Sequence, residues 1–203
     1  MIPATHAPDD LKNAIGRATP TPLSFSWPPG IPATKAEVRV MWNSEALFVR
    51  ADLEDEDVTT TATEDSQLLF SLGDVFEIFL EAEGAGFYTE MHIAPGNHRL
   101  HLHFRHGDFE ALCQKSLTLA DLTVHPPGFE SQFLKTATGW AVEALIPVAQ
   151  VDPSGRITSE SRWKASFCRY DAWTDARPPV LSSTSEHQKL SFHRRQEWRP
   201  LCF

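Results

Sequence analysis

The sequence has few cysteines, and their spacing does not suit a structural site. Its 203 residues contain three cysteines, Cys113, Cys168 and Cys202, and no Cys-x-x-Cys pair. An odd count without that spacing argues against a disulfide framework and against a structural zinc site. We expect the three to be small, half-buried thiols.

Long apolar runs are also missing. No stretch approaches the roughly 18 consecutive apolar residues of a membrane-spanning helix, so we expect no membrane span. The first ten residues contain neither a basic residue nor an apolar run, and we recognise no secretory signal in them. The sequence is therefore that of an intracellular protein or of a secreted one without its leader, and it carries no signal for an oligomeric state.

Basic residues are scarce relative to acidic ones. Lys and Arg total 18 against 27 Asp and Glu, which gives a formal net charge of -9. Such a chain repels a phosphate backbone, so we expect no nucleic-acid partner. The sequence also lacks a Gly-x-Ser-x-Gly elbow, a phosphate-binding loop and a His-Glu-x-x-His motif, and we assign no catalytic residue.

What the sequence does contain is a β-strand pattern. Residues 1–35 are rich in proline and predict an extended lead-in. Polar and apolar residues then alternate with period two, which indicates strands with one buried face. The predicted strands are 38–42, 47–53, 75–80, 87–93, 99–105, 140–146, 163–168 and 199–203.

This number of short strands favours an all-β fold. We predict one domain over residues 1–203, an antiparallel β-sandwich of immunoglobulin-like or jelly-roll type. One or two short helices are expected, near residues 9–15 and 109–119. The tryptophans at 42, 140 and 163 alternate with polar positions and are expected in the core.

The order of these segments resembles a known family, the family 9 carbohydrate-binding modules and the wider DOMON-like sandwiches. The resemblance covers most of the chain and implies non-catalytic binding of a saccharide or a polysaccharide end. Members are often linked to glycoside hydrolases in extracellular polysaccharide breakdown. The matching segments are 38–49, 52–58, 73–80, 88–96, 139–147, 163–171 and the tail 192–203.

The resemblance also implies two tryptophans that clamp the terminal sugar, and both are replaced here. Phe70, Ser71 and Leu72 stand just before Gly73, where the first tryptophan is expected. Serine and threonine stand near the second position, so Trp173 is the nearest substitute platform.

Glu77 is the sharpest candidate for a ligand contact. It is the one charge in the apolar strand 75–80, and a buried carboxylate without a partner is costly. It therefore either faces a pocket or forms an ion pair with Arg39 or Arg50. The family resemblance places a sugar-contacting carboxylate at this position.

Glu90 and His92 lie two residues apart on one strand and share a face. If the next strand is an antiparallel neighbour, its polar residues, Arg99 first, are expected to adjoin that face and form a polar wall. An ordinary solvated face is the alternative, which we favour for the histidines at 101 and 103. The full candidate site is Glu77, Glu90, His92, Arg99, Arg169, Tyr170 and Trp173.

An acidic stretch offers a candidate metal site. Asp52, Glu54, Asp55 and Asp57 supply the carboxylate oxygens that calcium prefers, and the family resemblance permits structural calcium. The alternative is a solvated charge run, because no EF-hand spacing is present. We expect no other cofactor to be required.

Two further functions stay open at this stage. Met41 or Met91 with a nearby histidine could ligate haem, as in some DOMON relatives, which would make the chain a redox module. An enzyme, metal-dependent or glycosidic, could use Glu77 and Glu90 as a carboxylate pair. We nevertheless predict saccharide binding without catalysis.

Overall fold

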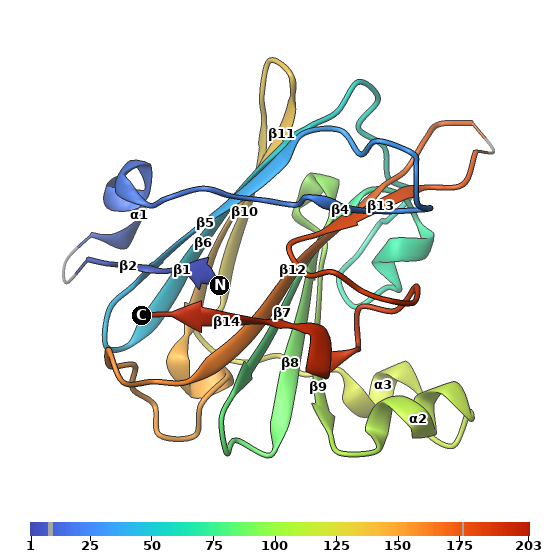
Figure 1. The fold of residues 1–203 in the computed structure, drawn as a ribbon. Coiled ribbons are helices and arrows are strands. Elements are labelled where there is room, and N and C mark those ends of the chain that lie inside the picture. The colour runs from blue at the N-terminus through green and yellow to red at the C-terminus, as the bar shows by residue number, and fades with distance from the viewer. Residues whose placement is uncertain (8–9, 176) are drawn as a thin grey trace.

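The computed structural model describes residues 1–7, 10–175 and 177–203, and two β-sheets packed face to face dominate it (Figure 1). The front sheet is formed by β1 (Ile2–Pro3), β14 (Arg199–Cys202), β12 (Trp163–Asp171), β7 (Val75–Ala82), β8 (Phe87–Ile93) and β9 (Arg99–Arg105), with β13 (Val180–Ser183) paired to β12 and β4 (Phe25–Trp27) paired to β13. The back sheet is formed by β10 (Glu130–Lys135), β11 (Gly139–Pro147), β6 (Ala46–Glu54), β5 (Ala36–Trp42) and β2 (Thr5–His6), with β3 (Thr21–Pro22) also paired to β5.

The predicted β-sandwich is confirmed, and its long strands lie where the period-two alternation predicts them. Most strand pairs are antiparallel, but β1 pairs with β14 and β2 with β5 in parallel. Both exceptions come from the proline-rich segment 1–35, which supplies four short strands to the edges of the two sheets.

Helices are short and few. The α-helices are α1 (Leu11–Ala14), α2 (Asp108–Cys113) and α3 (Leu119–Leu122), and the 3-10 turns are Ile15–Arg17, Leu69–Ser71, Pro95–Asn97, Val148–Gln150 and Arg195–Glu197. Across the described ranges no helix is both long and apolar enough to cross a membrane.

The main core lies between the sheets. Phe76, Ile78 and Leu80 of β7 point toward the back sheet and join a cluster with Trp140 and Trp163, all of them buried. Burial of one such side chain stabilises a fold by roughly 1.5–3 kcal/mol. The predicted core positions of the tryptophans are thereby confirmed, Trp42 at 7% exposure included.

The opposite side of the front sheet, which we call its outer face, is covered as well. Val75 and Phe79 of β7 point outward and belong to a second apolar cluster that includes Phe192 and Trp198. These last two come from the segment before β14, while α2 and α3 pack on the same side. Strand β7 is therefore buried on both faces, as its apolar sequence predicts.

The three cysteines are free and differ in environment. Cys113 on α2 is exposed, Cys202 on β14 is half-buried, and Cys168 on β12 is fully buried. The expectation of half-buried thiols therefore holds for Cys202 and is wrong for the other two.

Candidate functional site

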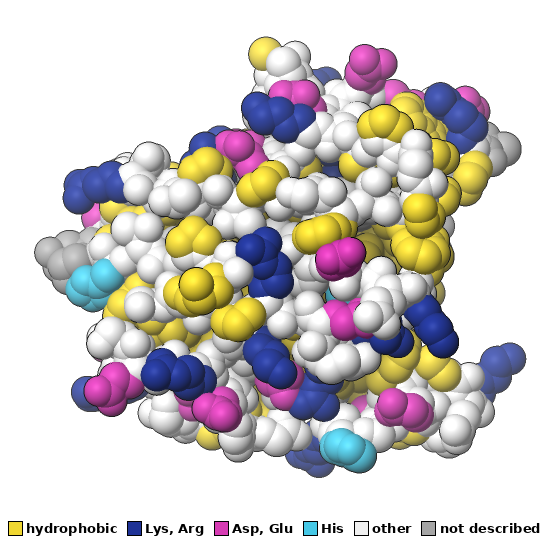
Figure 2. All heavy atoms as spheres, viewed as in Figure 1, with side chains coloured by type: hydrophobic (Ala, Val, Ile, Leu, Met, Phe, Trp, Pro, Cys, Tyr) yellow, Lys and Arg dark blue, Asp and Glu magenta, His cyan; other side chains and the backbone are white. Residues whose placement is uncertain are grey.

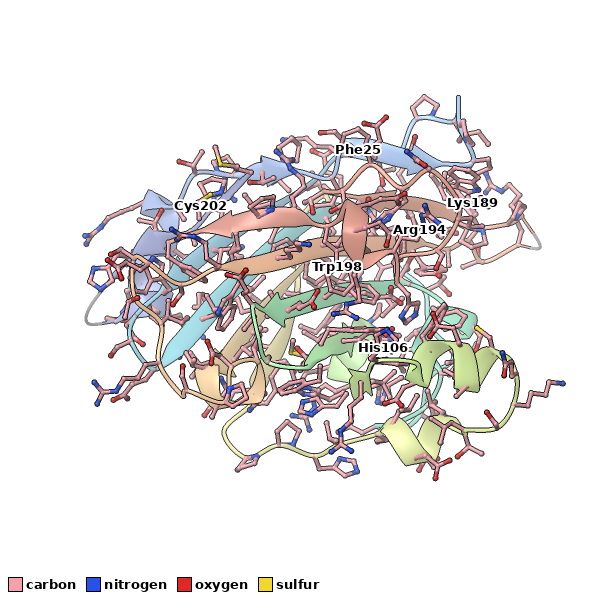
Figure 3. All side chains as sticks on the ribbon, turned by 60° about the horizontal axis from the view of Figure 1, so that its bottom comes forward. Phe25, His106, Lys189, Arg194, Trp198 and Cys202 are labelled. Carbon is pink, nitrogen blue, oxygen red and sulfur yellow. The ribbon has the colours of Figure 1, made fainter. Side chains whose placement is uncertain are left out.

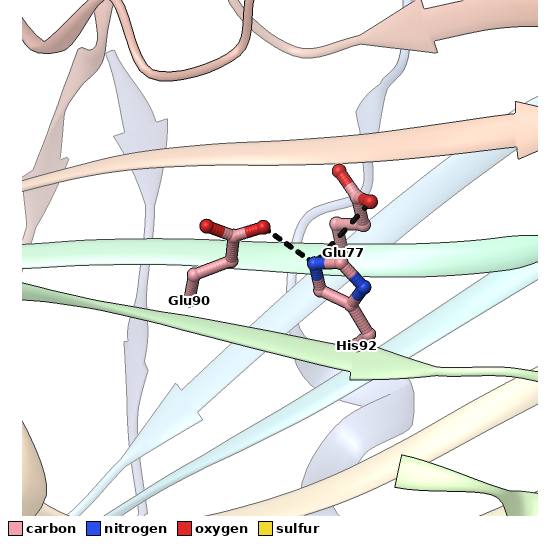
Figure 4. Close-up of side chains that lie close together, drawn as sticks. All are labelled: Glu77, Glu90 and His92. Carbon is pink, nitrogen blue, oxygen red and sulfur yellow. Dashed lines mark hydrogen bonds and ion pairs between the residues drawn. The ribbon is translucent and has the colours of Figure 1, made fainter. Parts of the chain in front are cut away.

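Three polar side chains meet on the outer face of the front sheet. Glu77 of β7 stands opposite His92 of β8 in the strand register, so both point to the same side of the sheet. Glu90 lies two residues before His92 on β8 and shares that side. Figure 4 shows the three side chains converging from two neighbouring strands.

The cluster of Glu77, Glu90 and His92 is tight and buried. The Nε2 atom of His92 lies 2.5 Å from Oε1 of Glu90 and 3.4 Å from Oε1 of Glu77. The exposed fractions are 2% for Glu77, 4% for Glu90 and 1% for His92. The geometry confirms none of the expected ligand contacts, but it does bring these three candidates together.

Burial and mutual charge set the protonation of the cluster. Burial raises the pKa of Glu77 to about 8, because the nearby His92 charge only partly offsets it. For Glu90, burial raises the pKa, but the charges of His193 and His92 outweigh it and leave the pKa lowered. Burial lowers the pKa of His92, and the two carboxylates more than compensate, so it ends raised. Near neutral pH the cluster therefore holds a protonated Glu77 beside a Glu90–His92 ion pair.

His193 extends this cluster from the segment before β14. Its Nε2 atom lies 3.6 Å from Oε2 of Glu90, and its Nδ1 atom is hydrogen-bonded to the Tyr88 hydroxyl at 2.8 Å. Its ring stacks on Phe109 of α2 with centroids 3.8 Å apart. Sequence reasoning missed His193 as a site residue, since its distance from β8 along the chain hides the contact.

The segment that carries His193 crosses the outer face of the front sheet. In Figure 3 Arg194 and Trp198 lie on one side of β7 and β8, and His106, at the turn before α2, lies on the other. The indole N–H of Trp198 donates to the carbonyl oxygen of Phe192 at 2.6 Å and closes the segment on itself. This internal hydrogen bond helps to keep His193 in place.

An aromatic pair lies next to the cluster. The rings of Phe70 and Tyr170 are stacked with centroids 5.4 Å apart and an angle of 25°, and the Phe70 ring is 6.3 Å from that of His92. Phe70 is 38% exposed. It thus presents an aromatic surface close to the position from which the expected tryptophan is missing.

Gly73 and Asp74 fix the approach of Phe70 to β7. Gly73 has a φ of +146°, and a Cβ there would lie 2.4 Å from the carbonyl oxygen of Thr59, so only glycine fits. The Asp74 carboxylate accepts hydrogen bonds from the backbone N–H groups of Thr59 and Ala172, at 2.6 and 2.8 Å. Two loops are thereby tied to the start of β7.

Residues 19–166 match the family model described as "Carbohydrate family 9 binding domain-like". The chain belongs to this family. The family is the one that the sequence motifs resemble, so that prediction is confirmed. Among curated proteins no significant match is found.

Solved structures share the family 9 fold with this chain. A putative carbohydrate-binding protein from Bacteroides uniformis ATCC 8492 has a TM-score of 0.76 and 12% identity, with 100% of this chain and 98% of that chain covered. A family 9 module from Caldicellulosiruptor kristjanssonii in complex with cellotriose has a TM-score of 0.69 and 14% identity, with 99% and 92% covered. A family 9 module from the same organism in complex with glucose has a TM-score of 0.69 and 13% identity, with 99% of this chain and 94% of that chain covered.

Together the family and these neighbours support non-catalytic carbohydrate binding as predicted, and they do not favour the haem-carrying or enzymatic alternatives. At these identities the neighbours establish the fold alone. The site of this family 9 domain must therefore be argued from its own residues.

The structure does not bring Arg99 to the cluster. In the β8–β9 register Glu90 pairs with Leu102 and His92 with Leu100, so leucines share their face. The prediction of a polar wall is therefore wrong. Arg99, His101 and His103, which alternate with the leucines along β9, point to the opposite side of the front sheet. Arg99 instead donates to Asp65 at 2.8 Å. Its alternate neighbour His101 is only 5% exposed, so the predicted solvated face is also wrong there.

Arg169 also lies away from the cluster. It is fully buried and donates to Asp171 at 2.8 Å and Asp55 at 2.9 Å. Its neighbour on β12, Tyr170, points to the outer face, so successive residues serve opposite sides of the sheet. Arg169 is a structural cation in this family 9 domain rather than a member of the candidate group.

Trp173 lies beyond the end of β12, in the loop that contacts the acidic stretch. The guanidinium of Arg177 sits 3.9 Å above its ring, and the backbone N–H of Thr174 donates to Asp57 at 3.0 Å. Trp173 is thus half-buried beneath a cation instead of forming an open platform.

The alternative interpretation of Glu77 as the partner of Arg39 or Arg50 is wrong. Arg39 pairs with Glu37 and Asp52 on the back sheet. Arg50 pairs there with Asp52 and Glu143. Both arginines thus belong to the opposite layer of the sandwich.

The four acidic candidates for calcium do not form one group of ligand atoms among the described residues. Asp52 is paired with arginines and Glu54 with Lys35 at 3.7 Å. Only Asp55 joins a close carboxylate group, with Asp74 and Asp171. There Arg169 donates to Asp55 and Asp171, so two of the three carboxylates already have a cationic partner.

Proposed function

We propose that the chain binds a saccharide on the outer face of the front sheet, beside Phe70 and Tyr170. The observation that carries this proposal is the meeting of a stacked, half-open aromatic pair with the polar cluster on one face. Saccharide recognition uses both elements, a flat apolar surface for the C–H face of the ring and polar groups for the hydroxyls.

The shape of the surface supports this location. Figure 2 shows hydrophobic side chains gathered at the upper right and a hollow below them on the side of α2 and α3. Phe70 at 38% and Leu68 at 40% exposure come from the loop before β7. A saccharide ring stacked on Phe70 would cover apolar surface that otherwise faces water.

Each candidate residue takes a distinct role in this proposal. Glu77 accepts from a saccharide hydroxyl or, protonated, donates to one, and hydrogen bonds that involve a charged group contribute about 1.5–3 kcal/mol. Because Glu77 is 2% exposed, the ligand reaches it only when neighbouring side chains turn aside. Glu90 and His92 hold the Glu77 carboxyl in position, and Tyr170 supports Phe70 from below.

Arg99, Arg169 and Trp173 act indirectly in this proposal. Arg169 fixes the end of β12, from which Tyr170 projects, and Trp173 caps the neighbouring loop. Arg99 holds Asp65 and with it the loop that carries Phe70. Saccharide binding needs no calcium in this arrangement, so a chelator is expected to leave the affinity unchanged.

Glucose-based saccharides are the first ligands to test, because family 9 neighbours are seen with cellotriose and glucose. Calorimetric titration with both sugars, followed by a glycan array, would identify the preferred ligand. We expect Phe70→Ala to weaken binding at least tenfold, since it removes the stacking surface.

Phe25→Ala is the matched control for this test. Phe25 is 37% exposed, nearly the same as Phe70, but lies on β4 away from the cluster. We expect it to bind as the parent does. Equal affinities for the parent and Phe70→Ala would remove the proposed location, and no binding across the array would remove the function.

A further inference from the structure

Two buried carboxylates compete for a single imidazole nitrogen in the cluster. The Nε2 atom of His92 lies 2.5 Å from Glu90 and 3.4 Å from Glu77, yet a ring nitrogen carries at most one hydrogen. The short contact gives that hydrogen to Glu90. Glu77, which is 2% exposed, is left with the longer contact of 3.4 Å to the same nitrogen.

A second atom in the same place is also without a partner. The Oε2 atom of Glu90 is buried and accepts no hydrogen bond, although His193 lies 3.6 Å away. A buried carboxylate oxygen without a partner is costly, and Glu90 and Glu77 point at one spot beside His92. A metal ion bound between them would displace the protons of Glu77 and His92 and give the free oxygen of Glu90 a partner.

We infer that Glu77, Glu90 and His92 form a binding site for a divalent transition-metal ion of the zinc type. One ligand atom from each residue lies within 4.8 Å of the others. An imidazole nitrogen with two carboxylate oxygens is a donor set that zinc accepts, whereas calcium and magnesium favour oxygen ligands alone.

The observed spacing suits such an ion with little rearrangement. Ligand atoms about 2.1 Å from a tetrahedral zinc ion lie about 3.4 Å from one another. The Glu77–His92 distance is already 3.4 Å, and Glu90 has to retreat from 2.5 Å by roughly one ångström.

His193 and Tyr88 would support this site as positioning residues. The Tyr88 hydroxyl orients the His193 ring, whose Nε2 atom faces the free oxygen of Glu90. Groups that hold metal ligands in this way tune affinity, and their loss weakens it about 10–100-fold. Three protein ligands leave one coordination position open.

The test is a calorimetric titration of chelator-treated protein with ZnCl₂, without saccharide. We expect one ion per chain, a rise in the melting temperature on binding, and at least a tenfold weaker Kd for Glu90→Gln and for His92→Gln. His106→Gln and Glu83→Gln change exposed residues outside the cluster and serve as matched controls that keep the parent affinity.

Binding that is absent, or equally strong in the parent and both cluster variants, would overturn the metal site. Should those variants fold poorly, the isosteric Glu77→Gln change and the spectrum of the Co²⁺-loaded protein decide instead. We expect tetrahedral Co²⁺ bands without a thiolate charge-transfer band. A thiolate band would reject the proposed set of ligands, because Cys168, which stands opposite Glu77 in the β12–β7 register, would then be a ligand. Because no sugar is present, the outcome is independent of the proposed saccharide function.

Discussion

Arg169 and Asp171 lie two residues apart on β12 and form an ion pair of 2.8 Å that is almost completely shielded from water. The same guanidinium reaches Asp55 at 2.9 Å and the carbonyl oxygen of Glu54 at 2.7 Å. One cation thus joins the front sheet to the chain leaving the back sheet. The pair also fixes the end of β12, which carries Tyr170 to the proposed site.

Replacing Arg169 is expected to destabilise the fold strongly. Arg169→Gln leaves two buried carboxylates without their partner, and breaking a buried pair in this way costs about 3–5 kcal/mol. Urea unfolding would measure the loss. Arg177→Gln, which breaks the exposed pair with Asp175, is the control and should leave the free energy of unfolding nearly unchanged. A loss for Arg169→Gln no larger than for the control would show that the pair is dispensable.

Gly73 is expected to tolerate no side chain. Gly73→Ala places a Cβ against the Thr59 carbonyl at a positive φ, which should cost about 1–3 kcal/mol and displace the Phe70 loop. Thermal unfolding together with saccharide titration would detect both effects. Gly16→Ala meets no atom within 4 Å and should change neither. Wild-type stability in Gly73→Ala would mean that the loop adopts another path.

His101 should make the protein sensitive to acid. Its pKa is lowered to about 3, mainly by burial and further by His103 and His125. Between pH 6.5 and pH 3 the unfolded chain binds a proton there and the folded chain does not, so stability falls as the pH falls, by up to about 1.4 kcal/mol per pH unit.

His101→Leu removes this contribution. We expect its free energy of unfolding to fall less steeply than that of the parent between pH 6.5 and pH 4, as measured by urea titration at several pH values. His106→Leu alters an exposed histidine and should leave the slope unchanged. Parallel slopes for the parent and His101→Leu would contradict the buried neutral imidazole.

Glu77→Gln should separate the contribution of Glu77 to saccharide binding from its contribution to the stability of the fold. Glutamine keeps the shape of a protonated Glu77, so the melting temperature should change little near neutral pH, while the altered hydrogen-bonding group should weaken saccharide binding roughly tenfold. The titration is done with chelator present, so that metal plays no part. Unchanged affinity would assign the saccharide contact to other residues.

The fold was largely predictable because period-two alternation is strong in the long strands. The segments β10 and β13 were missed, because Glu130–Lys135 is largely polar and Val180–Ser183 is only four residues long. Their strand character depends on the neighbours with which they pair, and a local pattern does not contain that information.

The site was predictable only in part, for a related reason. A lone charge in an apolar strand singled out Glu77, and spacing placed Glu90 with His92. Which face of β9 adjoins them depends on the length of the turn after Ile93, because a shift of one residue exchanges the two faces. The contact with His193 spans over a hundred residues of sequence and leaves no local signal.

The different surroundings of the cysteines allow Cys113 to be labelled selectively. Burial raises the pKa of the Cys168 thiol well above its ordinary range, so this thiol stays unreactive, while Cys113 on α2 is open to solvent. A fluorophore attached to Cys113 would sit one helical turn from Phe109, whose ring stacks on His193. An optical probe at that position could follow events at the buried cluster without disturbing any residue proposed to hold a ligand.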